Sequence, residues 1–273
     1  MTPTHGRHLL RFNLYHRILH GMVIVSFLGL ALTGLPLKYA DLPVCSVIAH
    51  LLGGPMTARY LHRVLAIVTF LYFGLHLGYL ARLVVNRTPG VFWGPNSMVP
   101  QPRDLFDLLN HLRYFMGQGQ RPKFARFTYW EKFDYWAVFW GVGIIGTSGL
   151  VLWFSTFFGR YLPGWLFNVA FFIHSEEALL ATSFIFTIHF FNSHLRPEKF
   201  PMDTVIFTGR VEEAEYRTEH ESSYDDLAAR GELEAAVTDA PQPWMLDFAR
   251  VVGFCAVALG LSLAVLIAVA TFH

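Results

Sequence analysis

The chain has 273 residues, of which 53% are hydrophobic, 16% aromatic and only 15% charged, and its formal net charge is +1. This apolar share exceeds that of an ordinary soluble domain, and a near-neutral chain without a basic patch argues against a nucleic-acid partner. The two cysteines stand alone, with no C-x-x-C-H motif for covalent attachment of a cofactor.

Apolar stretches predict five membrane-spanning helices. The first covers about residues 16–37 and the second about 60–84, each long enough for the roughly 20 residues that a bilayer requires. No small-residue cleavage site follows the first stretch, so we expect it to be a retained span. The basic connection 86–132 should stay in the cytoplasm. Within it, RDLFDLLNHLRYFMG has the apolar spacing of a helix that lies on the membrane surface.

The third span is predicted at about 133–156 and the fourth within residues 167–200. An acidic segment follows over 201–243, where we expect one or two short surface helices and a linker. A fifth span starts at Trp244 and, beyond Asp247 and Arg250 in its first two turns, is rich in Ala, Leu and Val without Asp, Glu, Lys or Arg to about residue 271, so its expected role is anchoring and packing. Small residues in the third span would let a backbone or a flat macrocycle approach closely; they include Gly141, Gly143, Gly146 and Gly149.

The distribution of lysine and arginine predicts the orientation of the chain. The arginine-rich N-terminus and the connection 86–132 should face the cytoplasm, whereas the short loops that carry Lys38, Arg59 and Arg160 should face outward. The expected location is therefore a bacterial inner membrane, crossed several times, with the N-terminus cytoplasmic and the C-terminus periplasmic.

Histidines inside the apolar spans carry the functional prediction, because a polar ring in a span is costly unless it has a partner or a role. His174 and His189 lie fifteen residues apart, which is roughly 22 Å and about four helical turns. His62 and His76 repeat this spacing on the second span at roughly 21 Å. Both helices should run from outside to inside, so each presents one histidine at an outer and one at an inner depth. Imidazoles that face one another at membrane depth suit an axially bis-ligated haem, which predicts a membrane di-haem cytochrome b.

The inner depth has more candidate ligands than one haem needs. His189 can face His20 from the first span or His76 from the second, and periodicity alone does not choose between them. His76 is also a candidate ligand for a third haem, and His16 is a further, weaker candidate.

Segments around these histidines resemble the haem-binding segments of the membrane gamma subunits of formate dehydrogenases and the related cytochrome b subunits of thiosulfate reductases and hydrogenases. The resemblance extends over about residues 10–200. It implies two haem b groups, one held by His62 and His174 at the outer depth and one by His20 and His189 at the inner depth. The segments are RILHGM (17–22), RYLHRVLAI (59–67) and FFIHSEEALLATSFIFTIHFF (171–191).

Two features depart from that family pattern: His76, and the acidic segment with its fifth span. The longer form, including WEKFDYW and HLRPEKFPMD, is similar to cytochrome b subunits that accompany periplasmic multihaem cytochromes c in anaerobic respiration. This similarity implies a periplasmic redox subunit as partner, either a multihaem cytochrome c or an iron–sulfur protein.

The expected mobile partner is quinone or menaquinone, because its chemistry needs protonatable groups near one haem. The start of the third span, FTYWEKFDYW, offers such groups between aromatic rings, and the family resemblance places quinone at this segment beside the inner haem. An ordinary interfacial charge cluster is the competing interpretation. The candidate residues are Tyr129, Glu131, Lys132 and Asp134.

Further charged residues lie near the histidines. Arg17, Arg196 and Lys199 are candidates for neutralising haem propionates, although they also suit the positive-inside pattern. Glu176 and Glu177 lie within one turn of the outer histidine of the fourth span. One of them is a candidate to hydrogen-bond a ligand imidazole and another to face a periplasmic partner, with polar packing as the alternative.

Together these features predict an all-α integral membrane protein. We expect a four-helix di-haem cytochrome b domain over residues 1–200, an acidic cytoplasmic segment over 201–243 and a C-terminal transmembrane helix over 244–273. The expected function is that of an electron-transfer subunit of a respiratory oxidoreductase, and the sequence leaves open whether this chain itself carries the quinone redox site. The alternatives are an intramembrane metal-binding or metal-transport protein that uses the same histidines, and a structural anchor whose haems only stabilise the bundle.

Overall fold

The computed structural model describes residues 6–272, and these are mostly helical. Five helices are long and apolar enough to cross a membrane, which confirms the number of spans predicted from the sequence. Their positions agree with the predicted ranges to within a few residues, apart from earlier starts for the second and third spans. They are α1 (Leu14–Lys38), α3 (Pro55–Val85), the third span (Tyr129–Trp153), the fourth span (Trp165–Leu195) and α13 (Pro243–Phe272).

The third and fourth spans each contain π-helical turns, in which residue i bonds to residue i+5 and which often occur at functional sites. Hydropathy and periodicity did not predict them, because a local extra residue per turn leaves an apolar run unchanged. The third span consists of α5 (Tyr129–Gly141), the π segment η1 (Val142–Gly146) and α6 (Thr147–Trp153). The fourth consists of α8 (Trp165–Phe184) and the π segments η2 (Ile185–His189) and η3 (Phe191–Leu195).

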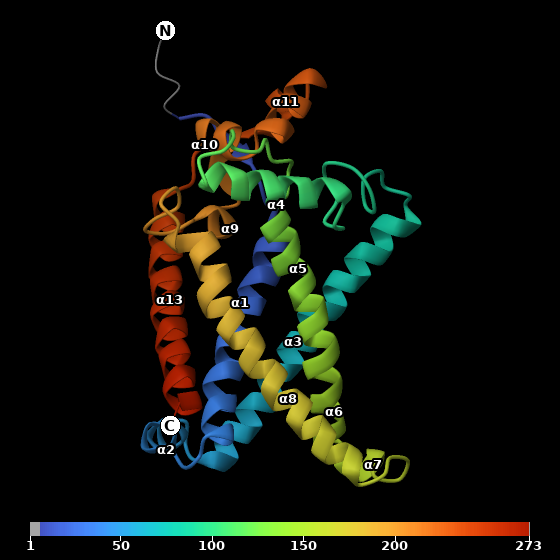
Figure 1. Ribbon diagram of the computed structural model, residues 1–273, viewed down its shortest axis with the longest axis vertical. Coiled ribbons are helices and arrows are strands. Elements are labelled where there is room, and N and C mark those ends of the chain that lie inside the picture. The colour runs from blue at the N-terminus through green and yellow to red at the C-terminus, as the bar shows by residue number, and fades with distance from the viewer. Residues whose placement is uncertain (1–5, 273) are drawn as a thin grey trace. The chain divides into compact units, whose positions relative to one another are not determined.

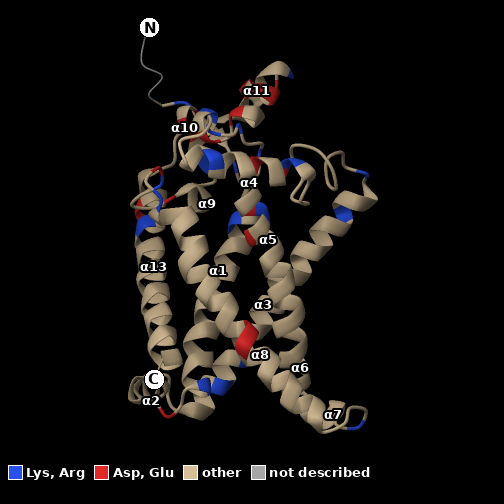
Figure 2. Cartoon of the chain, viewed as in Figure 1, with Lys and Arg blue, Asp and Glu red and all other residues tan. Residues whose placement is uncertain are grey.

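The described residues fall into two compact units. The span unit contains residues 18–77, 137–203 and 250–272, and its helices are almost uncharged in Figure 2 apart from a few segments. Its core joins side chains from α1, α13, the π segment η2 and the short helix α2 (Pro43–Leu51), which lies beside the C-terminal end of α13 (Figure 1). The most buried members of this core are Ala31, Leu35, Cys45, Phe186, Phe190, Leu263, Leu266 and Ile267.

Helix α13 is seated against the π segment through a glycine. A Cβ atom at Gly260 would collide with the rings of Phe186 and Phe190, so only glycine leaves room for these two side chains. Gly253 admits the side chain of Met202 in the same way. The fifth span therefore packs closely on the fourth, as expected for an anchoring helix.

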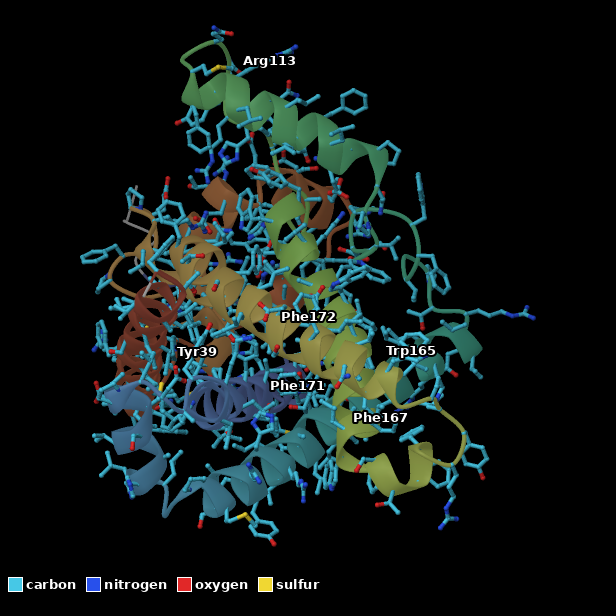
Figure 3. The ribbon with its side chains drawn as sticks, turned by 60° about the horizontal axis from the view of Figure 1, so that its bottom comes forward. Tyr39, Arg113, Trp165, Phe167, Phe171 and Phe172 are labelled. Carbon is cyan, nitrogen blue, oxygen red and sulfur yellow. The ribbon has the colours of Figure 1, made fainter. Side chains whose placement is uncertain are left out.

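Large side chains on α8 remain exposed, as expected for a surface that meets lipid. Trp165, Phe171 and Phe172, labelled in Figure 3, are all more than 60% exposed. An acidic pair interrupts this apolar helix and forms the red segment of α8 in Figure 2.

The polar unit contains residues 6–17, 78–136 and 204–249. A three-stranded antiparallel sheet lies within it, with β1 (His8–Leu10) between β2 (Arg210–Glu212) and β3 (Val237–Thr238). Leu9 pairs with Val211 and with Val237, and it shares a small core with Val211 and Tyr216. The acidic segment is thus joined to the start of the chain. The sequence predicted no sheet, because strands of two or three residues are too short for an alternating pattern.

Short helices complete the polar unit. Helix α4 (Pro102–Phe115) begins at a capping box between Gln101 and Asp104, with proline at its first position. The acidic segment forms two short helices and two single helical turns, where the sequence predicted one or two helices and a linker. These are α9 (Val205–Thr208), α10 (Glu213–Glu219), α11 (Glu221–Ala229) and α12 (Leu233–Ala236). The span unit also contains the single turn α7 (Ser155–Phe158).

Candidate functional site

The structure brings the predicted outer histidines together. His62 on α3 and His174 on α8 have ring centroids 6.2 Å apart, at an interplanar angle of 71°. Both side chains are half-buried within the span unit. The two rings are therefore close enough to share one metal ion.

Hydrogen bonds determine which ring nitrogen of each outer histidine is left to bind a metal. His174 Nδ1 lies 2.9 Å from the carbonyl oxygen of Ile145 in η1, and because a carbonyl only accepts, this nitrogen carries the proton. His62 Nδ1 lies 2.9 Å from Thr33 Oγ1, whose own proton goes to the carbonyl of Gly29 at 2.7 Å. Both rings therefore keep a lone pair on Nε2, the protonation state that a metal-binding imidazole requires.

Glycines lie against both outer imidazoles. A Cβ at Gly149 would lie 2.9 Å from His174 Cε1, and a Cβ at Gly34 would lie 3.2 Å from His62 Cε1. These separations are shorter than ordinary van der Waals contacts, so a larger residue would displace the rings. The prediction that small residues of the third span allow close approach thus has a specific counterpart at Gly149.

The predicted inner histidines also lie close together. His20 on α1 and His189 at the end of η2 have ring centroids 6.5 Å apart, at an interplanar angle of 40°. His76 was the alternative partner; its ring lies 5.9 Å from that of Phe139. The geometry therefore favours His20 over His76 as the partner of His189.

The two pairs lie at different levels of the span unit. Thirteen residues of α1 separate His20 from Thr33, which contacts the outer pair through His62. At 1.5 Å per residue this is roughly 20 Å along the helix. The fifteen residues between His174 and His189 on the fourth span correspond to a similar distance, roughly 22 Å.

The spacing within each pair fits an ion held between two opposed imidazoles. A metal lies about 2 Å from each ligand nitrogen, and each nitrogen lies roughly 1 Å from its ring centre, so the two centroids are then about 6 Å apart. Within residues 6–272, no group of three or more His, Cys, Asp or Glu side chains is arranged to hold a metal ion. The histidines are thus grouped in twos, which suits a macrocycle with four ligand atoms of its own better than a bare tetrahedral ion.

His16, the weaker candidate at the inner depth, lies in the polar unit. Its Nδ1 is 2.7 Å from Asn13 Oδ1, and its ring packs edge-on against Tyr15 and Tyr79, at 5.7 and 5.3 Å. These contacts describe an aromatic cluster at the start of α1.

The predicted quinone residues of α5 are engaged with different partners in the polar unit. Tyr129 Oη lies 3.1 Å from Nδ1 of His111 on α4. Glu131 accepts hydrogen bonds from the backbone and hydroxyl of Thr128, both at 2.8 Å, and forms an ion pair with Arg11 at 3.1 Å. Thr128 and Glu131 thereby form a capping box at the start of the third span.

Lys132 is buried and donates to both carboxylate oxygens of Asp104, at 2.8 and 2.9 Å. Lys132 and Asp104 also line a cavity of about 410 Å³, together with Arg103 and Asp226. Asp134 lies on the next turn of α5 but does not line that cavity. Three of the four predicted quinone residues therefore have separate internal partners, and their assignment to quinone stays a prediction.

The remaining predicted residues are distributed between the two units. Arg17 Nε donates to the carbonyl of Phe207 at 2.8 Å in the polar unit. Arg196 directly follows η3 in the span unit, where Lys199 forms an ion pair with Asp203 at 3.1 Å.

The acidic pair of α8 lies beside the outer histidine in sequence. Glu176 forms an ion pair with Lys38 at 2.6 Å, and the same ammonium donates to Ser175 at 3.1 Å. The Nδ1 proton of His174 goes to the carbonyl oxygen of Ile145. The carboxylate of Glu176 instead binds Lys38, the last residue of α1. The roles of Glu177 and of Arg196 stay predictions.

No protein-family model matches the chain, and a search of curated proteins finds no significant match. The resemblance to gamma subunits and related cytochromes b therefore stays a prediction that rests on the quoted motifs.

Sequence reasoning missed the groups that orient the outer imidazoles. Thr33 and Gly34 are adjacent in α1 and contact the same ring, and this Thr-Gly pair, located at the outer depth, was an available signal. The sequence contained no signal for the Ile145 carbonyl, because the position of a backbone acceptor depends on the local path of the chain. The burial of His194, discussed below, had no sequence signal either, because the residue lies at the end of an apolar run.

Proposed function

We propose that this chain is a b-type cytochrome, the membrane electron-transfer subunit of a respiratory oxidoreductase in the bacterial inner membrane. It passes electrons between the quinone pool and a periplasmic redox subunit, either a multihaem cytochrome c or an iron–sulfur protein. The observation that carries the proposal is the presence of two imidazole pairs, with centroids 6.2 and 6.5 Å apart, at two levels of one helical unit. The proposed family is the one that the sequence motifs resemble.

In this proposal His62 and His174 hold the outer haem, and His20 and His189 hold the inner one. Each bis-imidazole haem supplies a reversible one-electron couple with no coordination position left for a substrate. Thr33 and the Ile145 carbonyl hold the outer rings in one tautomer, and Gly34 and Gly149 set how closely the rings approach their neighbours. Apolar side chains of the spans keep water from the pairs.

The residues also indicate why the chain would transfer electrons rather than transport metal. A transported ion needs a site from which it can leave, built from ligands that complete its coordination. The described residues offer histidine pairs and no larger cluster. Two pairs at separate levels suit fixed redox centres along the membrane normal.

The test is a haem assay of the purified chain with a spectrum of its reduced form. We expect a sharp b-type α band and two haem b per chain, falling to one in His62→Ala and in His189→Ala. His50→Ala is the matched control, because His50 lies exposed on α2. Absence of the α band in the unaltered protein would contradict the proposal, and more than two haems would revise the count and implicate His76.

A second measurement separates electron transfer from a purely structural role for the haems. In membranes that contain the chain, a menaquinol analogue such as menadiol should reduce the haems. His20→Ala should remove the inner component from the redox titration, whereas His76→Ala should leave both components. Haems that stay oxidised with quinol, in an assembled protein, would favour the structural anchor.

A further inference from the structure

His194 is a buried imidazole that the proposed haem pairs do not use. It lies in the π segment η3, near the end of the fourth span, and its residue is only 9% exposed. Among residues 6–272 its Nδ1 atom is buried without a hydrogen-bond partner. A buried nitrogen of this kind is costly to leave unsatisfied, so such an atom in a native protein calls for a ligand or a partner.

The position of His194 relates it to the inner pair. It follows His189 by five residues through π-helical backbone, in which residue i+5 lies about one turn beyond residue i. His194 is near enough to His20 and His189 to interact electrostatically with both. Its ring lies 6.0 Å from the buried ring of Phe190 at an interplanar angle of 65°, so the imidazole has an apolar neighbour on this side.

We infer that His194 donates a hydrogen bond to a carbonyl oxygen of quinone bound beside the inner histidine pair; this inference rests on the proposed function. A quinone headgroup is a flat ring with two carbonyl acceptors, and it requires an N–H or O–H donor together with an aromatic or apolar wall. His194 supplies the donor, and apolar side chains of the spans around the inner pair supply the wall. The site lies near the end of the fourth span that also carries the Lys199–Asp203 ion pair.

The alternative donors within the described chain are less suited to this role. Glu131 and Lys132, which the sequence favoured, have their charges satisfied by Arg11 and Asp104. His20 and His189 are committed to each other across the proposed haem. His194 is thus an imidazole of this region whose Nδ1 is buried without a hydrogen-bond partner among residues 6–272.

The experiment measures binding of a quinone analogue, a fluorescent hydroxyquinoline N-oxide, and the rate of haem reduction by menadiol. His194→Phe keeps a ring of similar size but removes both nitrogens, and His194→Asn restores an N–H close to the position of Nδ1. We expect His194→Phe to weaken analogue binding about tenfold, the effect of losing one hydrogen bond. His194→Asn should recover most of that loss, and the haem content should stay at two per chain in both.

The control is His50→Phe, the same substitution at an exposed position of α2. If His194→Phe binds the analogue and reacts with menadiol as the unaltered protein does, the inference fails while the proposed function stands. If His194→Phe instead loses the inner haem, His194 belongs to the haem-holding residues and the inference is also wrong. If the unaltered protein shows no b-type band or no reduction by menadiol, the proposed function itself fails.

Discussion

The outer imidazoles are each held by a neighbour that occupies Nδ1. For His174 this neighbour is a backbone carbonyl and for His62 it is a hydroxyl, so the two rings are oriented by groups of different acceptor strength. A stronger acceptor makes the opposite nitrogen a more basic ligand. The outer haem would therefore have ligands of unequal basicity, and its potential should respond to either contact.

Thr33→Val tests this control of the outer centre. Valine has a similar shape but accepts no hydrogen bond, so His62 loses its Nδ1 partner. We expect the outer haem to be retained about 10–100-fold less tightly, as for other lost partners of metal-bound histidines, and its midpoint potential to rise. Redox titration of the two haem components measures the shift. Thr69→Val is the matched control, since Thr69 only donates to the Leu65 carbonyl of its own helix; an equal shift there would refute the assignment.

Gly149→Ala tests the steric limit at His174. The added methyl carbon would lie 2.9 Å from Cε1 and 3.1 Å from Nδ1 of that ring, so the imidazole must move. We expect the haem content to fall from two toward one per chain, with loss of the outer component. Gly143→Ala provides the comparison, because a Cβ there meets nothing within 4 Å. Equal haem loss in the two variants would indicate a general helix effect instead.

Among the elements, the π segments are the features most closely tied to the histidines. The carbonyl of Ile145 that bonds His174 belongs to η1, and His189 ends η2. A π turn changes the direction in which later residues of a helix point, relative to an unbroken α-helix. The direction in which His189 points relative to His174 on the fourth span therefore depends on η2.

Helix α4 has a polar face bonded within its unit and an apolar face that is exposed. Asp104 and His111 contact α5 through Lys132 and Tyr129, and burial raises the pKa of Asp107 on the same polar side. The exposed stripe repeats at helical spacing and consists of Leu105, Leu109, Leu112 and Met116, with Phe106 beside it. Such a helix suits the membrane surface that the sequence predicted for it.

We expect the stripe of α4 to enter the lipid headgroup region. Single cysteines at Leu109→Cys and Asn110→Cys, in a background without Cys45 and Cys255, would carry an environment-sensitive fluorophore. The label at position 109 should show a blue-shifted emission in liposomes, whereas the exposed polar position 110 should resemble water. Equal spectra at both positions would show that this face meets solvent or protein instead of lipid.

At the scale of the whole molecule, five helices are long and apolar enough to cross a membrane, and five crossings would put the N-terminal and C-terminal ends of this chain on opposite sides. The positive-inside pattern predicts that the N-terminus is cytoplasmic. Fusion of alkaline phosphatase to the C-terminus should therefore be active, and fusion of green fluorescent protein at the same place should be dark. The reverse result would invert the orientation and move the His20–His189 pair to the periplasmic side.

The acidic segment illustrates where sequence reasoning about the whole chain was incomplete. It was predicted as a separate region over 201–243, whereas in the structure residues 204–249 form one compact unit with residues 6–17 and 78–136. The pairing of β1 with β2 and β3 accounts for this, because it joins segments about two hundred residues apart in the chain. Such long-range pairing leaves no local pattern in so short a strand.

The sequence by itself determined the number and approximate positions of the five long apolar helices, and it predicted two levels at which histidines occur. Both follow from one-dimensional quantities, the length of an apolar run and the rise of a helix. Helix spacing left His20 and His76 open as partners of His189, and the tertiary structure brings the His20 ring beside it. Only the tertiary structure decided that Thr33 and the Ile145 carbonyl orient the outer rings and that His194 is buried. Those outcomes depend on which helix faces meet and on local π turns, and side-chain spacing along a single helix carries no information about either.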